Sequence, residues 1–532
     1  MSVFIGYPSF MAYQMMKGKK GNNDDFPSIS GMIARYSALG LTNEEMSKNP
    51  VWVDKTGNGH DLQMKNLSWK GMSGVGGVST YYDKYEFTPD KYYMVAVSSG
   101  TQHAQFTFKV TGLVDGNTLS LADTSSPSNV YGKWTQDGIY TVDIDVINTD
   151  RSLYFYNGVS ATRGEFTIEI LPLYPGALIF DGVDDYGVCE NFPILTKEKG
   201  YTVVALRQWD QDFLNTTLTG GLLSTRNYST GEGVAFEKIE SSNKGYWNLG
   251  AGGIIDFAKS PFTWQTSKQY NNVGILKGDK NHGKPLCVEC GLSGGQQCGR
   301  FAIWELVFLD HDATEEELNK IKDYFVKTYP WLFPDQAWTV VGKTNEDEDR
   351  ATIANITGNG NDLVLSNFGF AEGSGYNKEG EHAGYLVTDG VDDEIISAKL
   401  IQFADKFTIV GDWKFMEDRN DNAGLKANQI YIYNATTGMK IYLKQGSKNY
   451  LFTRKRINAL TSDGWVYDEK WDKYKVYPIG SHIDISNRLF LGFYSSNFTK
   501  IALKNLGIYN DQLLSKDDCI KAYNYLQTLK AK

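Results

Sequence analysis

Short runs of alternating apolar and polar residues dominate this chain. Segments such as 106–110 (FTFKV), 139–146 (IYTVDIDV) and 166–171 (FTIEIL) place an apolar side chain at about every second position. That period is typical of a β-strand with one buried face. Glycine, asparagine and aspartate separate the runs and favour tight turns. The pattern therefore predicts an all-β protein.

Four sequence elements occur twice and in the same order. TGNGHDL (56–62) is repeated as TGNGNDL (357–363), FDGVDD (180–185) as TDGVDD (388–393), and YTVVALRQW (201–209) as FTIVGDWKF (407–415). A strand followed by a short helix also occurs twice, at 301–325 and 501–526. In the last pair, Thr314 and Ser515 are candidate helix N-caps followed by acidic residues. Ordered repetition at this length predicts two copies of one domain.

The two copies differ by one long insertion. Thr56 and Asp181 are 125 positions apart, whereas Thr357 and Asp389 are 32 apart, so the first copy carries 93 additional residues. Five short alternating segments within the insertion predict a small β-sandwich, and an exposed hairpin tip tolerates such an insertion. The predicted domains are an N-terminal attachment segment (1–30), a discontinuous first copy (31–79 and 175–334), the insert (80–174) and a second copy (335–532). We expect the second copy to fold by itself.

The ordered motifs resemble the laminin-G-like, concanavalin A-like jelly-roll superfamily. This resemblance implies two concanavalin A-like jelly-roll sandwiches, the first interrupted by the inserted β-sandwich. The combination also resembles laminin-G-bearing proteins encoded by Bacteroides and their crAss-like phages. There it implies a virion fibre or adhesin that is made in the host cytoplasm and has other virion proteins and host cell-surface polysaccharide as partners.

The net charge argues against one class of partner, nucleic acid. The net charge is −10 at pH 7, and the densest basic run is the short segment 454–456. Binding to nucleic acid without sequence preference requires a basic surface that contacts phosphates. We therefore expect no nucleic-acid partner.

The N-terminal segment is apolar and aromatic but resembles neither a signal peptide nor a membrane span. Its apolar residues precede its lysines and are interrupted by Pro8, whereas a secretory signal begins with positive charge. No run approaches the roughly 18 apolar residues of a membrane span. We expect this segment to attach the protein to the virion or to its own copies, with an extra strand on the first jelly roll as the alternative; the candidate residues are Phe4, Tyr7, Phe10 and Met11.

A catalytic motif would indicate a hydrolase, because jelly rolls also host glucanases. Enzymes of that kind resembling this fold carry the pattern E-x-D-x-x-E on one strand, and this pattern does not occur in the chain. No Ser-His-Asp signature, phosphate-binding glycine loop or dinucleotide fingerprint lies in a suitable context. The sequence predicts that the protein is not an enzyme, with a polysaccharide-degrading enzyme as the competing hypothesis.

Three aspartates of the repeated DGVDD motif are candidate metal ligands. Asp181, Asp184 and Asp185 could bind Ca²⁺ through carboxylate oxygens. Three carboxylates fall short of the six to eight oxygen ligands that Ca²⁺ takes, and the motif also reads as a strand-turn signature. We therefore expect a structural turn, with calcium as the alternative and no other cofactor.

Aromatic residues in polar surroundings are the candidate carbohydrate-binding residues. Flat rings stack on sugar faces, while neighbouring polar groups bind the hydroxyls; the alternative is that the rings pack inside the sheets. The candidates are Trp465, Tyr467, Trp471, Tyr474, Trp247 and Trp264. The hypothesis is a structural virion protein of the head or tail that binds host glycan and self-associates, and the alternative is an architectural decoration without sugar binding.

Overall fold

The computed structural model describes most of the chain beyond its N-terminal segment. Residues 25–67 and 299–379 are described without interruption, and 382–416 and 500–531 nearly so. Between 69 and 288 and between 429 and 498 it describes the strands named below with their adjoining residues. The predicted attachment residues Phe4, Tyr7, Phe10 and Met11 lie outside the described residues.

The first jelly roll consists of two antiparallel sheets. One has the order β20-β15-β22-β13-β4, with β1 also paired to β22, and the other has the order β19-β18-β17-β16-β21-β14-β3-β2. Their strands are β1 (Met32–Ser37), β2 (Val51–Trp52), β3 (Leu62–Lys65), β4 (Gly77–Val78), β13 (Leu178–Asp181), β14 (Tyr186–Cys189), β15 (Thr202–Trp209), β16 (Gly220–Ser224), β17 (Ala235–Lys238), β18 (Gly245–Trp247), β19 (Ile254–Ile255), β20 (Phe262–Thr266), β21 (Leu286–Val288) and β22 (Arg300–Leu309). Large side chains such as Trp52, Phe180 and Trp209 are buried in the core to which both sheets contribute.

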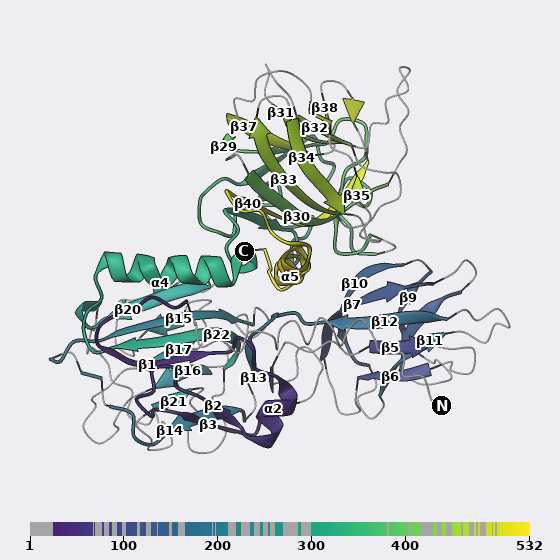
Figure 1. The fold of residues 1–532 in the computed structure, drawn as a ribbon. Coiled ribbons are helices and arrows are strands. Elements are labelled where there is room, and N and C mark those ends of the chain that lie inside the picture. Colours follow the sequence, from purple (N-terminus) through teal and green to yellow (C-terminus); the bar gives the residue numbers. More distant parts are fainter. Residues whose placement is uncertain are drawn as a thin grey trace, which may run out of the picture.

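The insert is a sandwich of two four-stranded antiparallel sheets beside the first jelly roll (Figure 1). The orders are β10-β7-β12-β5 and β6-β11-β8-β9. The strands are β5 (Lys84–Phe87), β6 (Tyr93–Val97), β7 (His103–Thr111), β8 (Leu119–Ala122), β9 (Val130–Trp134), β10 (Gly138–Asp145), β11 (Leu153–Asn157) and β12 (Phe166–Leu171). A separate core holds Phe106, Phe108 and Phe155, whose rings meet edge to face or tilted.

The second jelly roll repeats the design of the first. Its two main sheets have the orders β26-β27-β40-β30-β33-β34-β35, with β23 on β40, and β24-β25-β28-β37-β31-β32-β36, with β29 on β37; β38 and β39 form a hairpin. The strands are β23 (Gln336–Thr339), β24 (Thr352–Ile353), β25 (Leu363–Ser366), β26 (Gly375–Tyr376), β27 (Leu386–Val387), β28 (Glu394–Ser397), β29 (Ile401–Gln402), β30 (Lys406–Phe415), β31 (Gln429–Tyr433), β32 (Met439–Tyr442), β33 (Tyr450–Asn458), β34 (Thr461–Tyr467), β35 (Lys473–Tyr474), β36 (Tyr477–Pro478), β37 (Ser486–Leu491), β38 (Phe493–Tyr494), β39 (Asn497–Phe498) and β40 (Ile501–Asn510). The predicted all-β fold class is confirmed.

Helices are few and short among the described residues. They are α2 (Asn43–Lys48), α4 (Glu315–Thr328), α5 (Lys516–Gln527) and the 3-10 turns η1 (Ser267–Gln269) and η2 (Pro330–Leu332). Thr314 caps α4 in a capping box with Glu317, and Ser515 caps α5, as the sequence predicts. Within the described part of the chain, no helix has the length and apolar character required to span a bilayer.

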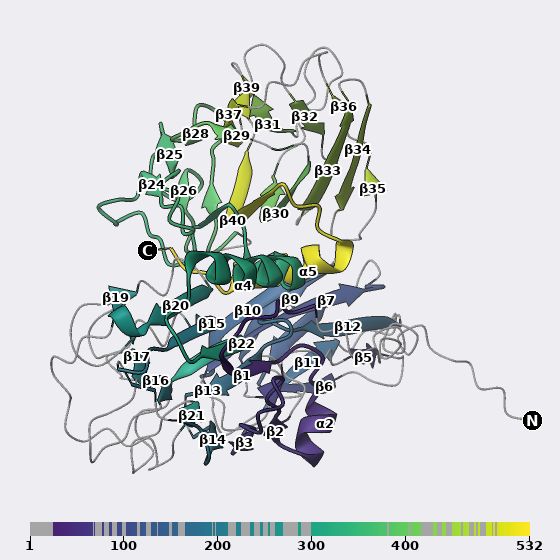
Figure 2. The same ribbon diagram turned by 60° about the vertical axis from the view of Figure 1, so that its left-hand side comes forward.

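The helix that follows the last strand of each copy lies between the two jelly rolls (Figure 1, Figure 2). One hydrophobic cluster joins side chains of α4, η2, α5 and segment 171–174 at the end of the insert. We call the contact among α4, η2, α5 and residues 171–174 the joint. The division of the chain into domains at the predicted boundaries stays a prediction.

Candidate functional site

The repeated TGNG motif is a turn that closes onto the first strand of its own copy. In the first copy, Asp54 Oδ1 accepts hydrogen bonds from the backbone N–H of Arg35 and of Thr56 at 3.1 and 3.0 Å. In the second copy, Asn355 Oδ1 accepts from the N–H of Ala337 and of Thr357 at 3.4 and 3.0 Å. The same turn is therefore built from an Asp in one copy and an Asn in the other, which shows that the carboxylate charge is dispensable for it.

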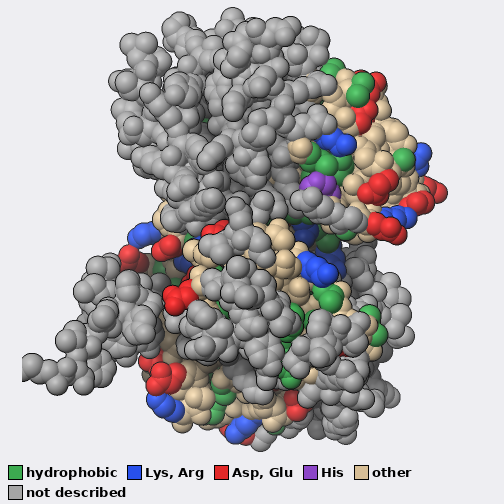
Figure 3. Space-filling view, turned by 90° about the vertical axis from the view of Figure 1, so that its right-hand side faces the viewer, with side chains coloured by type: hydrophobic (Ala, Val, Ile, Leu, Met, Phe, Trp, Pro, Cys, Tyr) green, Lys and Arg blue, Asp and Glu red, His purple; other side chains and the backbone are tan. Residues whose placement is uncertain are grey.

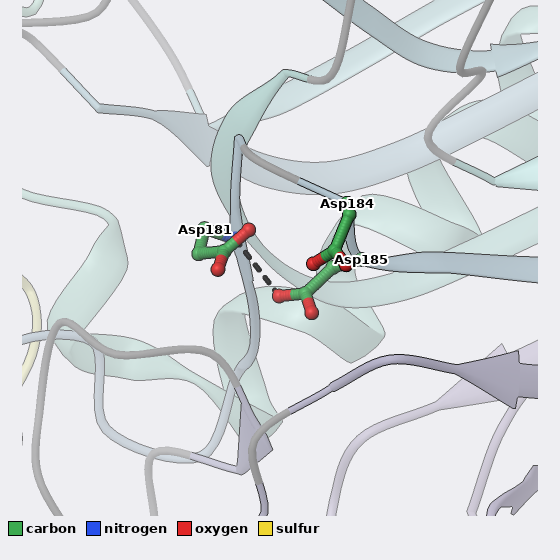
Figure 4. Close-up of side chains that lie close together, drawn as sticks. All are labelled: Asp181, Asp184 and Asp185. Atoms are coloured by element: carbon green, nitrogen blue, oxygen red, sulfur yellow. Dashed lines mark hydrogen bonds between the residues drawn. The ribbon is translucent and has the colours of Figure 1, made fainter. Parts of the chain in front are cut away.

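The DGVDD motif forms a second repeated turn, shown for the first copy in Figure 4. The candidate ligand oxygens of Asp181, Asp184 and Asp185 all lie within 4.8 Å of one another, and so do those of the second-copy aspartates 389, 392 and 393. The backbone N–H of Asp181 donates to Asp185 Oδ2 at 3.0 Å. The turn therefore brings the three predicted ligand residues together.

Crowding and burial change the acidity of one carboxyl group in each turn. Burial, with a further contribution from Asp181, raises the pKa of Asp185 to about 7. Burial likewise raises the pKa of Asp393 to about 6. A raised pKa means that negative charge at these positions is not compensated by the residues around it.

Three of the six carboxylate oxygens of the second-copy turn already accept hydrogen bonds within it. Asp393 accepts from the N–H of Asp389 at 2.6 Å through Oδ2 and from Ser374 Oγ at 3.1 Å through Oδ1. Asp389 Oδ1 accepts from the N–H groups of Val391 and Asp392 at 2.7 and 3.3 Å. These bonds leave too few free oxygens for the six to eight ligands of Ca²⁺. They favour the structural role, and calcium binding stays an untested alternative.

An asparagine from the neighbouring hairpin fastens each DGVDD turn. Asn66 Nδ2 donates to the carbonyl oxygen of Asp184 at 2.9 Å, and Asn367 Nδ2 donates to that of Asp392 at 2.9 Å. Both asparagines are left-handed, with φ of 66° and 67°. Asn is among the few residues that adopt this conformation readily.

We expect Asn66→Ala to lower the free energy of unfolding by about 1–2 kcal/mol, because alanine is strained at positive φ and cannot bond the Asp184 carbonyl. Asn66→Gly removes the same hydrogen bond without the backbone strain, so it should lower the free energy of unfolding by less than Asn66→Ala. Urea unfolding of both variants, with the Asn367 pair as a replicate, measures the difference. Equal losses for alanine and glycine would show that the left-handed backbone does not matter.

The described strands that carry carbohydrate-binding candidates belong to both jelly rolls, and β34 and β35, which carry three of the candidates, pair with each other. Trp264 lies on β20, the edge strand of the six-stranded sheet, and is 36% exposed. Trp247 lies on β18, Trp465 and Tyr467 on β34, and Tyr474 on β35, and their side chains are outside the described part. Trp471 lies outside the described residues altogether.

Eight large apolar side chains are exposed among the described residues. They are Leu39, Val53, Val130, Ile147, Trp264, Val364, Val391 and Leu400. On the face drawn in Figure 3, described acidic and basic side chains are interspersed and hydrophobic ones do not gather in a patch. Trp264 is the one aromatic residue in this set, which covers only the described residues.

Sequence reasoning missed two buried carboxylates that organise hydrogen-bond networks. Glu305 on β22 accepts from Arg35 Nε at 3.1 Å, Ser37 Oγ at 2.7 Å and Tyr329 OH at 2.8 Å. Burial raises the pKa of Glu305, although Arg35 opposes the shift. The available signal was a single acidic residue inside an apolar strand, in the segment AIWELVFL.

The second network surrounds Asp412 on β30. Its carboxylate accepts from Tyr385 OH at 2.9 Å, Tyr523 OH at 3.1 Å and Gln527 Nε2 at 3.3 Å. Burial raises the pKa of both tyrosines well above the usual value. Both hydroxyls therefore stay protonated at neutral pH and act as hydrogen-bond donors to the carboxylate.

Comparisons with known proteins identify no family. No protein-family model matches the chain, and no curated protein matches it. Among solved structures, the botulinum neurotoxin serotype D ligand-binding domain in complex with N-acetylneuraminic acid aligns at 10% identity and a TM-score of 0.25, covering 63% of this chain and 87% of that chain. Trypanosoma rangeli sialidase in complex with sialic acid aligns at 8% identity and a TM-score of 0.24, covering 84% and 82%. Likeness at such TM-scores supports no argument about which ligand or which reaction belongs to this chain.

The prediction that the protein is not an enzyme needs correction. Structures of Trypanosoma rangeli sialidase, an enzyme, are among those similar to this chain, and this finding contradicts the prediction. The absent E-x-D-x-x-E pattern marks paired carboxylates, whereas sialidases use a tyrosine nucleophile that this pattern does not include. The exclusion of catalysis is withdrawn, and the same comparisons supply no argument for a particular reaction.

Proposed function

We propose that the protein is a glycan-binding surface protein of a virion, a fibre or adhesin that presents its jelly rolls to host polysaccharide. The modular all-β architecture supports this proposal, since sandwich domains leave loops and strand edges free for recognition. The virion setting rests on the sequence resemblance to phage-encoded proteins. An architectural decoration without sugar binding is the competing function.

The observation that carries the proposal is the exposed indole of Trp264 at a sheet edge. Trp264 pairs in register with Val204 of β15, and the other side of β20 has no strand partner in the described sheet. Phe262, two positions earlier on the same face, packs against Phe325 of α4, with ring centroids 5.9 Å apart. Trp264 thus lies on the same face as the partly buried Phe262 but is exposed, so its flat ring is available to a sugar face.

Polar groups follow directly beyond the end of this strand. Ser267 Oγ donates to Asp312 Oδ1 at 2.8 Å, and Lys268 Nζ lies 3.9 Å from Asp312 Oδ2. The Lys268 side chain is exposed, and that of Asp312 is mostly covered. We propose that these polar groups bind the hydroxyls of a sugar whose face stacks on Trp264.

We expect Trp264→Ala to weaken binding to the preferred host glycan about tenfold, which corresponds to about 1.4 kcal/mol. The preferred glycan is first found on an array of bacterial surface polysaccharides, and titration calorimetry then measures the affinity. Trp264→Phe retains an aromatic ring and should therefore lose less affinity than Trp264→Ala. Val364→Ala, a matched exposed apolar position on β25, should leave the affinity unchanged.

Three results would decide against this function in different ways. If no glycan binds the full chain, the architectural decoration is favoured. If a glycan binds equally well to Trp264→Ala, recognition does not involve β20. Release of reducing ends or free sialic acid from the bound glycan would establish an enzyme instead of an adhesin.

A further inference from the structure

The second half of α5 and the turn after it are buried on all sides. Each of the eight residues 522–529 is buried. In α4, by contrast, buried positions such as Leu318 and Ile321 alternate with exposed ones, as in a helix that covers one sheet face. A helix buried around its circumference must contact a second body besides its own sheet.

One side of α5 is fixed to the second jelly roll. Tyr523 OH and Gln527 Nε2 donate to Asp412 Oδ2 on β30, at 3.1 and 3.3 Å. Asp412 is 3% exposed. This carboxylate therefore anchors two successive turns of the helix to its own sheet.

Another side of α5 is bonded to the rest of the chain. Asn524 Nδ2 donates to the carbonyl oxygen of Pro172 at 3.1 Å, where the insert returns to the first jelly roll. Gln208 Nε2, on β15 of the first jelly roll, donates to Thr528 Oγ1 at 2.8 Å. Both bonds are buried and join residues more than 300 positions apart.

Apolar packing continues the same contact. A single cluster contains Leu171 and Tyr174 from the end of the insert, Phe325 from α4, and Tyr525 and Leu526 from α5. The connection between the copies belongs to it, since Tyr509 OH donates to the carbonyl oxygen of Trp331 at 2.8 Å. Domains joined by a small polar interface move relative to each other by default, whereas an apolar, hydrogen-bonded one resists motion.

We propose that α5 is a clamp that locks the two jelly rolls and the insert into one rigid unit, so that the joint is not a hinge. Opening the joint would expose the apolar cluster to water and break the buried hydrogen bonds of Asn524 and Thr528, and both changes oppose the motion. This inference does not depend on glycan binding. It applies equally to an adhesin, a decoration or an enzyme.

The test uses the full chain. The wild type should unfold in one calorimetric transition whose van't Hoff and calorimetric enthalpies agree. The triple variant Gln208→Ala, Asn524→Ala, Thr528→Val removes the cross-joint bonds, and it should unfold in two transitions and show a larger radius of gyration in small-angle scattering. Gln527→Ala is the matched control, because it removes a bond from α5 to its own sheet and should lower the melting temperature without splitting the transition.

Two independent transitions in the wild type would overturn the clamp, and so would a triple variant that unfolds in one transition with an unchanged radius of gyration. Splitting in the Gln527→Ala control would also overturn it, since the effect would then reflect general destabilisation. If the triple variant fails to fold, hydrogen exchange of the wild type decides. Amides of residues 522–529 should be protected to within about tenfold of those in β15 and β22, and much faster exchange would contradict the proposal.

Discussion

Glu305→Ala is expected to lower the free energy of unfolding by about 3–5 kcal/mol, the largest loss that we predict for a single residue. The Arg35 and Glu305 side chains are 4% and 0% exposed, and Arg35 Nε lies 3.1 Å from Glu305 Oε2. Alanine would leave the guanidinium buried without its counter-charge and would deprive Ser37 and Tyr329 of their acceptor. Urea unfolding followed by circular dichroism measures the loss.

Two further variants separate the charge from the hydrogen bonds. Glu305→Gln keeps an oxygen that can accept from Ser37 or Tyr329 and should cost less than alanine. The double variant Glu305→Leu, Arg35→Met removes both charges and should recover much of the stability that Glu305→Ala loses. The attraction within a buried ion pair is largely offset by the cost of desolvating its two charges. A loss below about 1 kcal/mol for Glu305→Ala would contradict the predicted role of the pair.

The strands could be predicted from the sequence because their signals are local. Alternation between glycine and asparagine turns identified five strands of the insert, and these are β7, β8, β10, β11 and β12. The short or weakly alternating strands β5, β6 and β9 were missed. The repeated TGNG and DGVDD motifs marked turns correctly because their chemistry depends on neighbours within a few residues.

The joint could not be predicted, because it depends on contacts between distant segments. Asn524, Gln527 and Thr528 read in the sequence as the solvent side of an amphipathic helix. In the structure they are the residues that bond to Pro172, Asp412 and Gln208. The expectation that 335–532 folds by itself stays a prediction, and it did not take into account the side of α5 that the rest of the chain covers.

Asp185→Asn is expected to stabilise the protein at pH 8 by about 2–4 kcal/mol. The pKa of Asp185 is about 7 in the folded protein against 3.8 as the ordinary value, and the residue is 1% exposed. Below pH 4 the carboxyl group is protonated in both states and causes no penalty. Between about pH 4 and pH 7 the unfolded state ionises while the folded state stays protonated, so stability is lost over this range. Above pH 7 both states are ionised and the loss is complete. Asparagine stays neutral and its Oδ1 can still accept from the Asp181 N–H.

Thermal melts of both proteins between pH 4 and pH 8 measure the effect, and the two curves should converge at low pH. Asp184→Asn neutralises an exposed carboxylate of the same turn and serves as the matched control, with little expected change. Asp393→Asn should give a smaller gain than Asp185→Asn, because the pKa of Asp393 is raised only to about 6.

The same variant distinguishes the structural turn from a calcium site. A cation held by Asp181, Asp184 and Asp185 would stabilise their ionised forms and lower the pKa of Asp185. Asp185→Asn would then destabilise the protein at pH 8 in the presence of calcium, and calcium would raise the melting temperature of the wild type but not of the variant. The structural turn is supported if the variant is more stable and calcium changes the melting temperature of neither protein. Removing a buried charge stabilises a protein only when nothing compensates that charge.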